Sequence, residues 1–143
     1  MSSYQHSQFG TVIVVALGLF LGYLGGMSAV VGWVPVSVAV AVVILIAGLL
    51  FFRLEVAIAE RALVLRFGIG LVRLRFPIAD IRAARAVRSR WWEGWGIHRR
   101  GRGWLFNVSG RDAVEIELTS GAVHTIGTDE PQALLAAIER ARR

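Results

Sequence analysis

The chain has 143 residues, enough for one modest domain and an appendage, with 55% hydrophobic residues and a mean hydropathy of +0.58. It contains no cysteine, which excludes disulfides and thiolate metal sites. Residues 1–52 carry no Asp, Glu, Lys or Arg, whereas all 16 basic residues are arginines and lie after Phe52 with the 10 acidic residues. Two chemically distinct parts therefore meet between Phe52 and Arg53.

Two long apolar segments, residues 11–31 and 34–52, make up most of the uncharged part. Each has roughly the 20 residues that a helix needs to cross a hydrocarbon core of about 30 Å. The link between them has two residues, so we expect an antiparallel hairpin of two membrane spans, with Pro35 in the first turn of the second helix. A cleaved signal peptide is not expected, because no basic residue precedes the first segment and a second apolar segment follows at once.

The flanks of the hairpin predict its orientation. Arginines follow the second apolar segment at Arg53, Arg61 and Arg66, whereas the link and the short tail at residues 1–10 are uncharged. Short arginine-rich flanks stay in the cytoplasm. We therefore expect a multi-pass protein of the cell membrane with both termini in the cytoplasm.

Three glycines recur at four-residue spacing in the first apolar segment and share one helix face: Gly18, Gly22 and Gly26. Another helix can approach such a face closely. The second helix is the expected partner because it is already tethered nearby, through Ser37, Ala41 or Gly48. Contact between two copies of the chain, giving a homo-oligomer, is the alternative.

Apolar and polar residues alternate in the second part of the chain, as in half-buried strands. The alternation predicts seven strands, near residues 54–59, 63–67, 72–76, 81–87, 104–108, 113–118 and 122–127. An irregular stretch separates the fourth and fifth strands, and Thr128 or Asp129 is expected to cap a last helix that begins near Pro131. We expect an α+β protein in which residues 53–143 form an antiparallel β-roll or barrel that is closed by this helix.

Four segments carry a resemblance to a known family: FPIADI, GWGI, GWLFNVSGRDAVEIEL and IGTDEP. With the preceding hairpin, they resemble the small bacterial two-span membrane proteins that contain a pleckstrin-homology-like domain. The resemblance implies a pleckstrin-homology-like roll, a membrane location and, as for most of these proteins, no established activity. The phosphoinositide-binding members of the wider superfamily carry a Lys/Arg cluster in the loop joining the first two strands, but here residues 59–62 are short and charge-neutral.

No catalytic or metal-binding motif is apparent. None of the three histidines, His6, His98 and His124, has a histidine or carboxylate at helical ligand spacing, so neither a metal nor a cofactor is expected. We expect His124 to lie opposite Glu117 across a Ser-Gly turn and to form an ion pair with it. Glu115 and Glu117 share a strand face that we expect to be solvated, so no enzyme is predicted.

The positive charge is concentrated in one stretch. Residues 82–102 contain seven arginines and one acid, Glu93, and this difference of six equals the net charge of the chain, +6. Within residues 88–104 the arginines are interleaved with tryptophans. The candidate contacts to lipid or to a partner are Arg88, Arg90, Trp91, Trp92, Trp95, Arg99, Arg100 and Arg102, and Trp104 ends the stretch.

This composition suits a membrane interface. Tryptophan prefers the headgroup region, and an arginine beside an anionic leaflet contributes about 1 kcal/mol. We therefore predict a non-catalytic, membrane-anchored binding or scaffolding module that contacts anionic lipid headgroups. The alternative is a subunit of a membrane protein complex that recruits a partner protein through this domain.

Three other interpretations stay open. The tryptophans, Trp104 especially, can fill the core while the arginines are ordinarily solvated. Arginines and aromatic rings can also clamp nucleic acid, although a membrane tether disfavours that partner. An intramembrane enzyme is the most distant alternative, since neither apolar segment holds a charged residue.

Overall fold

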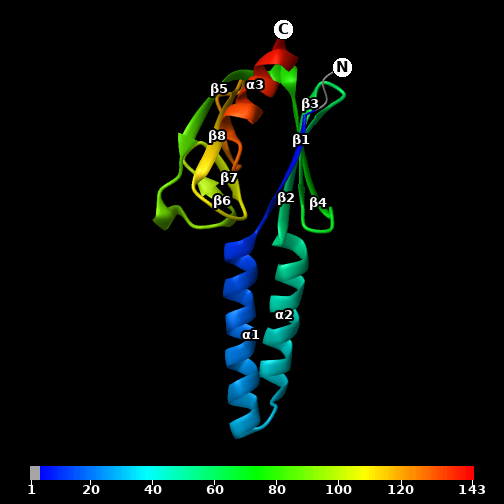
Figure 1. The fold of residues 1–143 in the computed structure, drawn as a ribbon, viewed down its shortest axis with the longest axis vertical. Helices are drawn as coiled ribbons and strands as arrows, with labels where there is room; N and C mark the ends of the chain where they lie inside the picture. The colour runs from blue at the N-terminus through cyan, green and yellow to red at the C-terminus, as the bar shows by residue number, and fades with distance from the viewer. Residues whose placement is uncertain (1–3) are drawn as a thin grey trace.

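The computed structural model describes residues 4–143 as a helical hairpin joined to a β-rich domain (Figure 1). Helices α1 (Thr11–Val31) and α2 (Pro35–Phe51) lie side by side and extend from one end of the β domain. A third helix, α3 (Pro131–Arg142), lies at the opposite end. The coarse prediction of a mixed α+β protein with a C-terminal helix is confirmed.

The two hairpin helices have no polar stripe, because apolar residues surround them on every side. Helix α1 has 21 residues and is about 31 Å long at 1.5 Å per residue. It is the one helix within residues 4–143 that is long and apolar enough to cross a membrane; α2 is a shorter apolar helix of 17 residues. Pro35 occupies the first turn of α2, as predicted.

The prediction that residues 1–10 form a short tail is wrong for residues 5–9, which form a strand. Strand β1 (Gln5–Phe9) pairs antiparallel with β2 (Arg53–Ala59). At the end of this pair the Gly10 amide donates to Phe52 O at 2.7 Å, so α1 and α2 join the β domain through neighbouring strands. The imidazole Nε2 of His6 lies 2.5 Å from Asp129 Oδ1, which connects β1 to the segment before α3. The β domain therefore begins before the hairpin, not after it.

The strands form two sheets. The first has the order β1-β2-β3-β4 and includes β3 (Ala62–Phe67) and β4 (Val72–Pro77). A single turn of 3-10 helix, η1 (Ile78–Asp80), leads into the second sheet. That sheet has the order β5-β8-β9-β7-β6 and contains β5 (Ile81–Arg88), β6 (Gly96–Arg100), β7 (Gly103–Asn107), β8 (Asp112–Leu118) and β9 (Val123–Gly127).

All seven predicted strands are present, each within a residue of its predicted ends. The described residues hold two more, β1 and β6, and β6 occupies part of the stretch that was predicted to be irregular. The fully antiparallel arrangement is also wrong, because β9 lies between β8 and β7 and runs parallel to β7. Thr128 Oγ1 accepts from the Glu130 amide at 3.1 Å, but no side chain caps the first turn of α3 itself.

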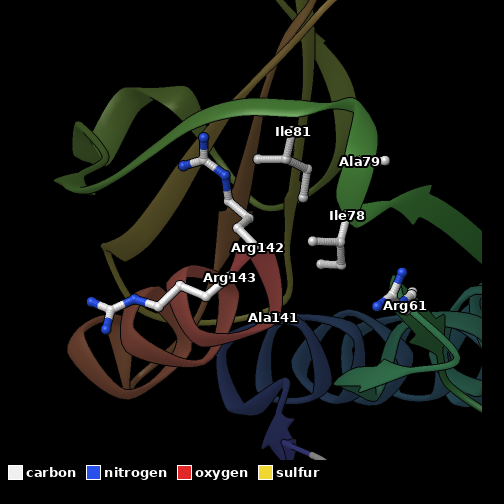
Figure 2. Close-up of a pocket in the computed structure, with 7 residues that line it drawn as sticks. All are labelled: Arg61, Ile78, Ala79, Ile81, Ala141, Arg142 and Arg143. Carbon is white, nitrogen blue, oxygen red and sulfur yellow. The ribbon is translucent and has the colours of Figure 1, made fainter.

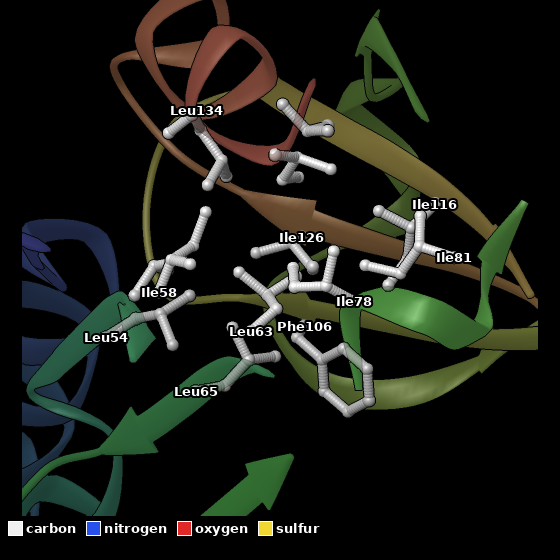
Figure 3. Close-up of a cluster of buried hydrophobic side chains, with 14 of the residues drawn as sticks. Leu54, Ile58, Leu63, Leu65, Ile78, Ile81, Phe106, Ile116, Ile126 and Leu134 are labelled. Atoms are coloured by element: carbon white, nitrogen blue, oxygen red, sulfur yellow. The ribbon is translucent and has the colours of Figure 1, made fainter. Parts of the chain in front are cut away.

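The hydrophobic core lies between the two sheets and under α3 (Figure 3). Alternate residues of β2 and β3 point into it, and Leu54, Leu63 and Leu65 have no exposed surface. Helix α3 adds Leu134 and Ile138, which are one turn apart and equally buried. Burial of these side chains is the main stabilising contribution, at roughly 1.5–3 kcal/mol for each large one.

Candidate interfacial surface

Residues 88–104, hereafter the Arg/Trp segment, are folded onto the second sheet. The segment holds a single 3-10 turn, η2 (Trp91–Glu93), strand β6 and the start of β7. Glu93 Oε1 lies 3.0 Å from Arg100 Nη2, and Arg100 Nη1 donates to Thr125 Oγ1 on β9 at 3.1 Å. These contacts join η2 to β6 and β6 to the interior of the sheet, so the segment is a built surface and not an irregular loop.

The tryptophans of the segment are exposed. Trp91 and Trp92 are 69% and 62% exposed, and their rings meet edge to face with centroids 5.8 Å apart. Trp95 and Trp104 are 40% and 41% exposed. The interpretation that these rings fill the core, Trp104 especially, is therefore wrong, because the core between the sheets is filled by Phe67, Phe106 and aliphatic residues instead.

The arginines of the segment divide into two groups. Arg88 lies 3.8 Å from Asp112, and Arg100 is paired with Glu93. The guanidinium of Arg90 sits over the Trp92 ring, 5.1 Å from its centroid. Within residues 4–143 no carboxylate lies within 4.0 Å of three exposed guanidinium groups, those of Arg90, Arg99 and Arg102. These three cations are available to an external anion.

The predicted contacts do not all form one patch. In the β6–β7 hairpin Gly96 pairs with Asn107 and Arg100 pairs with Gly103. Trp95 therefore lies beyond one end of this ladder and Arg102 beyond the other, and the ladder from Gly96 to Arg100 alone is about 13 Å long at the rise of a strand. An anionic surface must be extended, as a layer of headgroups is, to touch both.

The Trp95 end of the segment adjoins the start of the helical hairpin. Trp95 Nε1 donates to Gly110 O at 3.3 Å, in the turn between β7 and β8. In the same turn, Ser109 O accepts a hydrogen bond from Gln8 Nε2 at 2.9 Å. Gln8 lies two residues before Gly10, the N-cap residue of α1. Figure 1 shows the connection between β5 and β6 at the end of the β domain that faces the helices. The connection between β5 and β6, which holds Trp91, Trp92 and Trp95, thus lies at the end of the domain from which the apolar helices extend.

The glycine face of α1 is not packed against α2. A Cβ added at any of the three predicted packing positions, Gly18, Gly22 and Gly26, would meet no atom within 4 Å. The prediction of intramolecular glycine packing is therefore wrong. An apolar groove of about 490 Å³ lies between the helices, and Gly18, Leu17 and Leu45 are among the residues that line it. Of the expected partner positions, Gly48 does meet α1, through the side chain of Leu17 at 3.8 Å.

The predicted ion pair between His124 and Glu117 is also wrong, because the strand register differs by one residue. Glu117 pairs with Val123, whereas His124 pairs with Ile116. Burial lowers the pKa of His124 below its usual 6.5, and its Nδ1 accepts the Trp104 amide at 3.2 Å. Glu117 instead lies 3.6 Å from Arg82, on the neighbouring strand β5. Neutral His124 thus supports the start of β7.

A second cleft, of about 390 Å³, lies at the end of the domain away from the hairpin (Figure 2). Three arginines line it, Arg61, Arg142 and Arg143, but their guanidinium groups point in different directions and do not converge on one position. Arg142 Nη2 already donates to Arg82 O at 2.6 Å. Within residues 4–143 there is no group of three histidines or carboxylates that could hold a metal ion. The Arg/Trp segment remains the better candidate site.

Comparison with known proteins adds no family to this geometry. No protein-family model matches the chain, and no curated protein matches it.

Proposed function

We propose that the chain is a non-catalytic, membrane-anchored module whose β domain contacts anionic lipid headgroups through the Arg/Trp segment. One observation carries the proposal: the exposed Trp91, Trp92 and Trp95 and the unpaired Arg90 occur together in the β5–β6 connection, at the end of the β domain from which the apolar hairpin extends. Tryptophan is suited to the boundary between headgroups and acyl chains, and arginine to lipid phosphate.

The exposed apolar surface of the hairpin supports a bilayer location. Leu19, Val30 and Val36 are 72%, 83% and 71% exposed, although each belongs to a residue type that folding in water normally buries. A surface of this size needs an apolar solvent. In this proposal both helices span the bilayer, and α2 reaches across with the flanking Val34 and Phe52 and with local thinning of the lipid.

The paired strands β1 and β2 support a single side for the β domain. Since they lead directly into α1 and out of α2, the two ends of the hairpin open on the same membrane face. In this proposal every arginine of the chain, all of which follow Phe52, lies on that face, which favours the cytoplasm. A pleckstrin-homology-like roll in a bacterial membrane protein is the finer description that this proposal adopts from the sequence motifs.

Recruitment of a partner protein is the second candidate function. The observation that favours it is the position of β6 at the edge of its sheet, with β7 on one side only. An extended segment of a partner could add to such an edge by backbone hydrogen bonds. In that case the chain would serve as a subunit of a membrane protein complex.

The test uses the full chain in nanodiscs that contain brominated anionic lipid, with Trp33 of the hairpin link replaced by Phe. Bromine should quench the remaining tryptophans, and the quenching should fall as salt rises. Replacing Arg90, Arg99 and Arg102 together by Gln should weaken headgroup association about 100-fold, from about 1 kcal/mol for each arginine.

The matched control removes the same charge elsewhere, at Arg82, Arg85 and Arg140, and should leave the quenching unchanged. The proposal would be contradicted if quenching changed neither with salt concentration nor on replacement of Arg90, Arg99 and Arg102 by Gln. Recovery of one stoichiometric companion protein in mild detergent, independent of lipid charge, would favour the second function instead.

A further inference from the structure

The turn between β3 and β4, residues 68–71, is attached to the end of the second hairpin helix. The Ile69 amide donates to Leu49 O in the last turn of α2 at 3.3 Å, and the Gly68 amide donates to Arg53 O at 2.7 Å. Gly68 has a φ of +53°, and a Cβ there would collide with the Leu49 carbonyl. Figure 1 shows this turn beside the C-terminal end of α2. The β3–β4 turn is therefore held level with the last turn of α2 along the axis of that helix.

The tip of this turn is apolar and exposed. Ile69 is 59% exposed and Leu71 is 73% exposed, the largest value for any large apolar side chain in the β domain. Neither residue belongs to the core between the sheets. Both side chains are level with the last turn of α2. If α2 spans a bilayer as proposed, they lie where the acyl chains begin.

Two arginines lie directly behind the tip. Arg66 and Arg73 are opposite each other in the β3–β4 ladder, and both are exposed. Arg73 Nε donates to Gly70 O at 2.6 Å, which holds its guanidinium beside the turn. Like charges directly opposite each other destabilise a sheet unless an anion lies between them.

The nearest candidate counter-ion is already engaged. Glu55 is opposite Arg66 in β2, but it accepts from Gln5 Nε2 at 2.6 Å and lies 4.0 Å from Arg53. Within residues 4–143 no carboxylate lies within 4.0 Å of Arg66 or Arg73. The pair therefore presents two uncompensated cations just above two exposed aliphatic side chains.

We propose that this turn is a second membrane-contacting element, in which Ile69 and Leu71 enter the bilayer interface and a lipid phosphate binds between Arg66 and Arg73. The ligand is the headgroup of an anionic phospholipid, because only a lipid supplies the phosphate and the acyl chains at the spacing that the turn offers. This inference rests on the proposed membrane location of the hairpin, but it concerns a surface separate from the Arg/Trp segment. The β domain would then be held at two points, which fixes its orientation on the membrane.

The test exploits the absence of cysteine from the chain. Single variants Leu71→Cys, Leu45→Cys and Ala79→Cys are labelled with an environment-sensitive fluorophore, and the full chain is reconstituted in nanodiscs that contain doxyl-labelled lipids. Leu45, in the middle of α2, reports the hairpin; Ala79, exposed in the far cleft, reports bulk water. We expect quenching at positions 45 and 71 and none at position 79.

The outcomes separate the two proposals. If position 45 is not quenched, the membrane location fails and this inference fails with it. If position 45 is quenched and position 71 is as unquenched as position 79, the membrane location stands and the second contact is contradicted.

A second measurement tests the phosphate. With the label at position 71, doxyl-labelled anionic lipid should quench more than doxyl-labelled zwitterionic lipid. Replacing Arg66 and Arg73 together by Gln should reduce this preference about tenfold or more, given about 1 kcal/mol for each arginine. The control pair Arg82→Gln with Arg140→Gln removes the same charge and should leave the preference intact. An equal loss in both double variants, or none in either, would contradict a specific phosphate site.

Discussion

The hairpin and the β domain use the same apolar residue types in opposite ways. In the β domain Leu54, Leu63 and Leu65 have no exposed surface, whereas in the hairpin Leu19 is 72% exposed. Only Ser28 and Ile44 are buried in the two hairpin helices. The β domain therefore contains its own core, and the hairpin does not.

In the proposal above, the two regions are stabilised by different surroundings. Removing apolar surface from water stabilises the β domain internally. The hairpin buries almost nothing against itself, so in this proposal its stability depends on an apolar solvent around it and on backbone hydrogen bonds within each helix. Variants that separate internal packing from solvent contact can test this comparison.

The largest contrast should come from two leucines. Leu65→Ala should cost about 2–5 kcal/mol, because it leaves a cavity among fully buried side chains. Leu19→Ala should cost less than about 0.5 kcal/mol, because lipid or detergent fills the space. Denaturant unfolding of the full chain in detergent, followed by near-ultraviolet circular dichroism, measures both. Equal costs would mean that the hairpin is packed against protein.

A smaller contrast should come from two glycines. A Cβ at Gly127 would overlap the buried Asn107 side chain, so Gly127→Ala should cost about 1–3 kcal/mol. Gly18→Ala meets no atom within 4 Å and should change stability by less than about 0.5 kcal/mol in the monomer. Thermal unfolding of both variants in detergent would show the difference. A large loss at position 18 would instead reveal a helix–helix contact between copies of the chain.

The smallest effect should be a dependence of β-domain stability on pH. Burial lowers the pKa of His124 from 6.5, so on acidification the unfolded chain takes up a proton before the folded chain does. The contribution of His124 to stability should therefore fall as the pH drops through 6.5 and level off below its folded pKa. Melting temperatures of the wild type and of His124→Gln, compared between pH 8 and pH 5, should diverge in this range. Parallel curves would contradict the assigned burial.

The elements with strong local signals could be predicted from the sequence. Alternation located β2, β3, β4 and β5 almost to the residue, and Pro131 marked the start of α3. Two uncharged runs likewise located α1 and α2. In these segments the local pattern and the tertiary contacts agree.

The missed elements lack such local signals. Strand β1 reads QHSQF, a polar sequence without alternation, and it forms because its backbone completes the edge of β2. Strand β6 lies between glycines and arginines that resemble a loop, and its partner β7 fixes it. The parallel contact of β7 with β9 joins residues 20 apart in the chain, as in the pair Leu105–Thr125, and no periodicity reports it.

The candidate site was only partly predictable for the same reason. Composition located the Arg/Trp segment, but the pairing of Arg88 and Arg100 with carboxylates depends on tertiary contacts. The turn at residues 68–71 looked like an ordinary glycine turn in the sequence. Its place beside Leu49 of α2 appears only in the fold.

The most direct test of the whole account is the fractionation of the full chain after expression without detergent. We predict that the protein sediments with membranes on ultracentrifugation, resists extraction by alkaline carbonate, and dissolves only in detergent, because the exposed apolar surface of α1 and α2 requires lipid. A full-length product that stays in the supernatant as a monodisperse species would contradict the membrane-anchored hairpin and the interfacial contacts proposed for both surfaces.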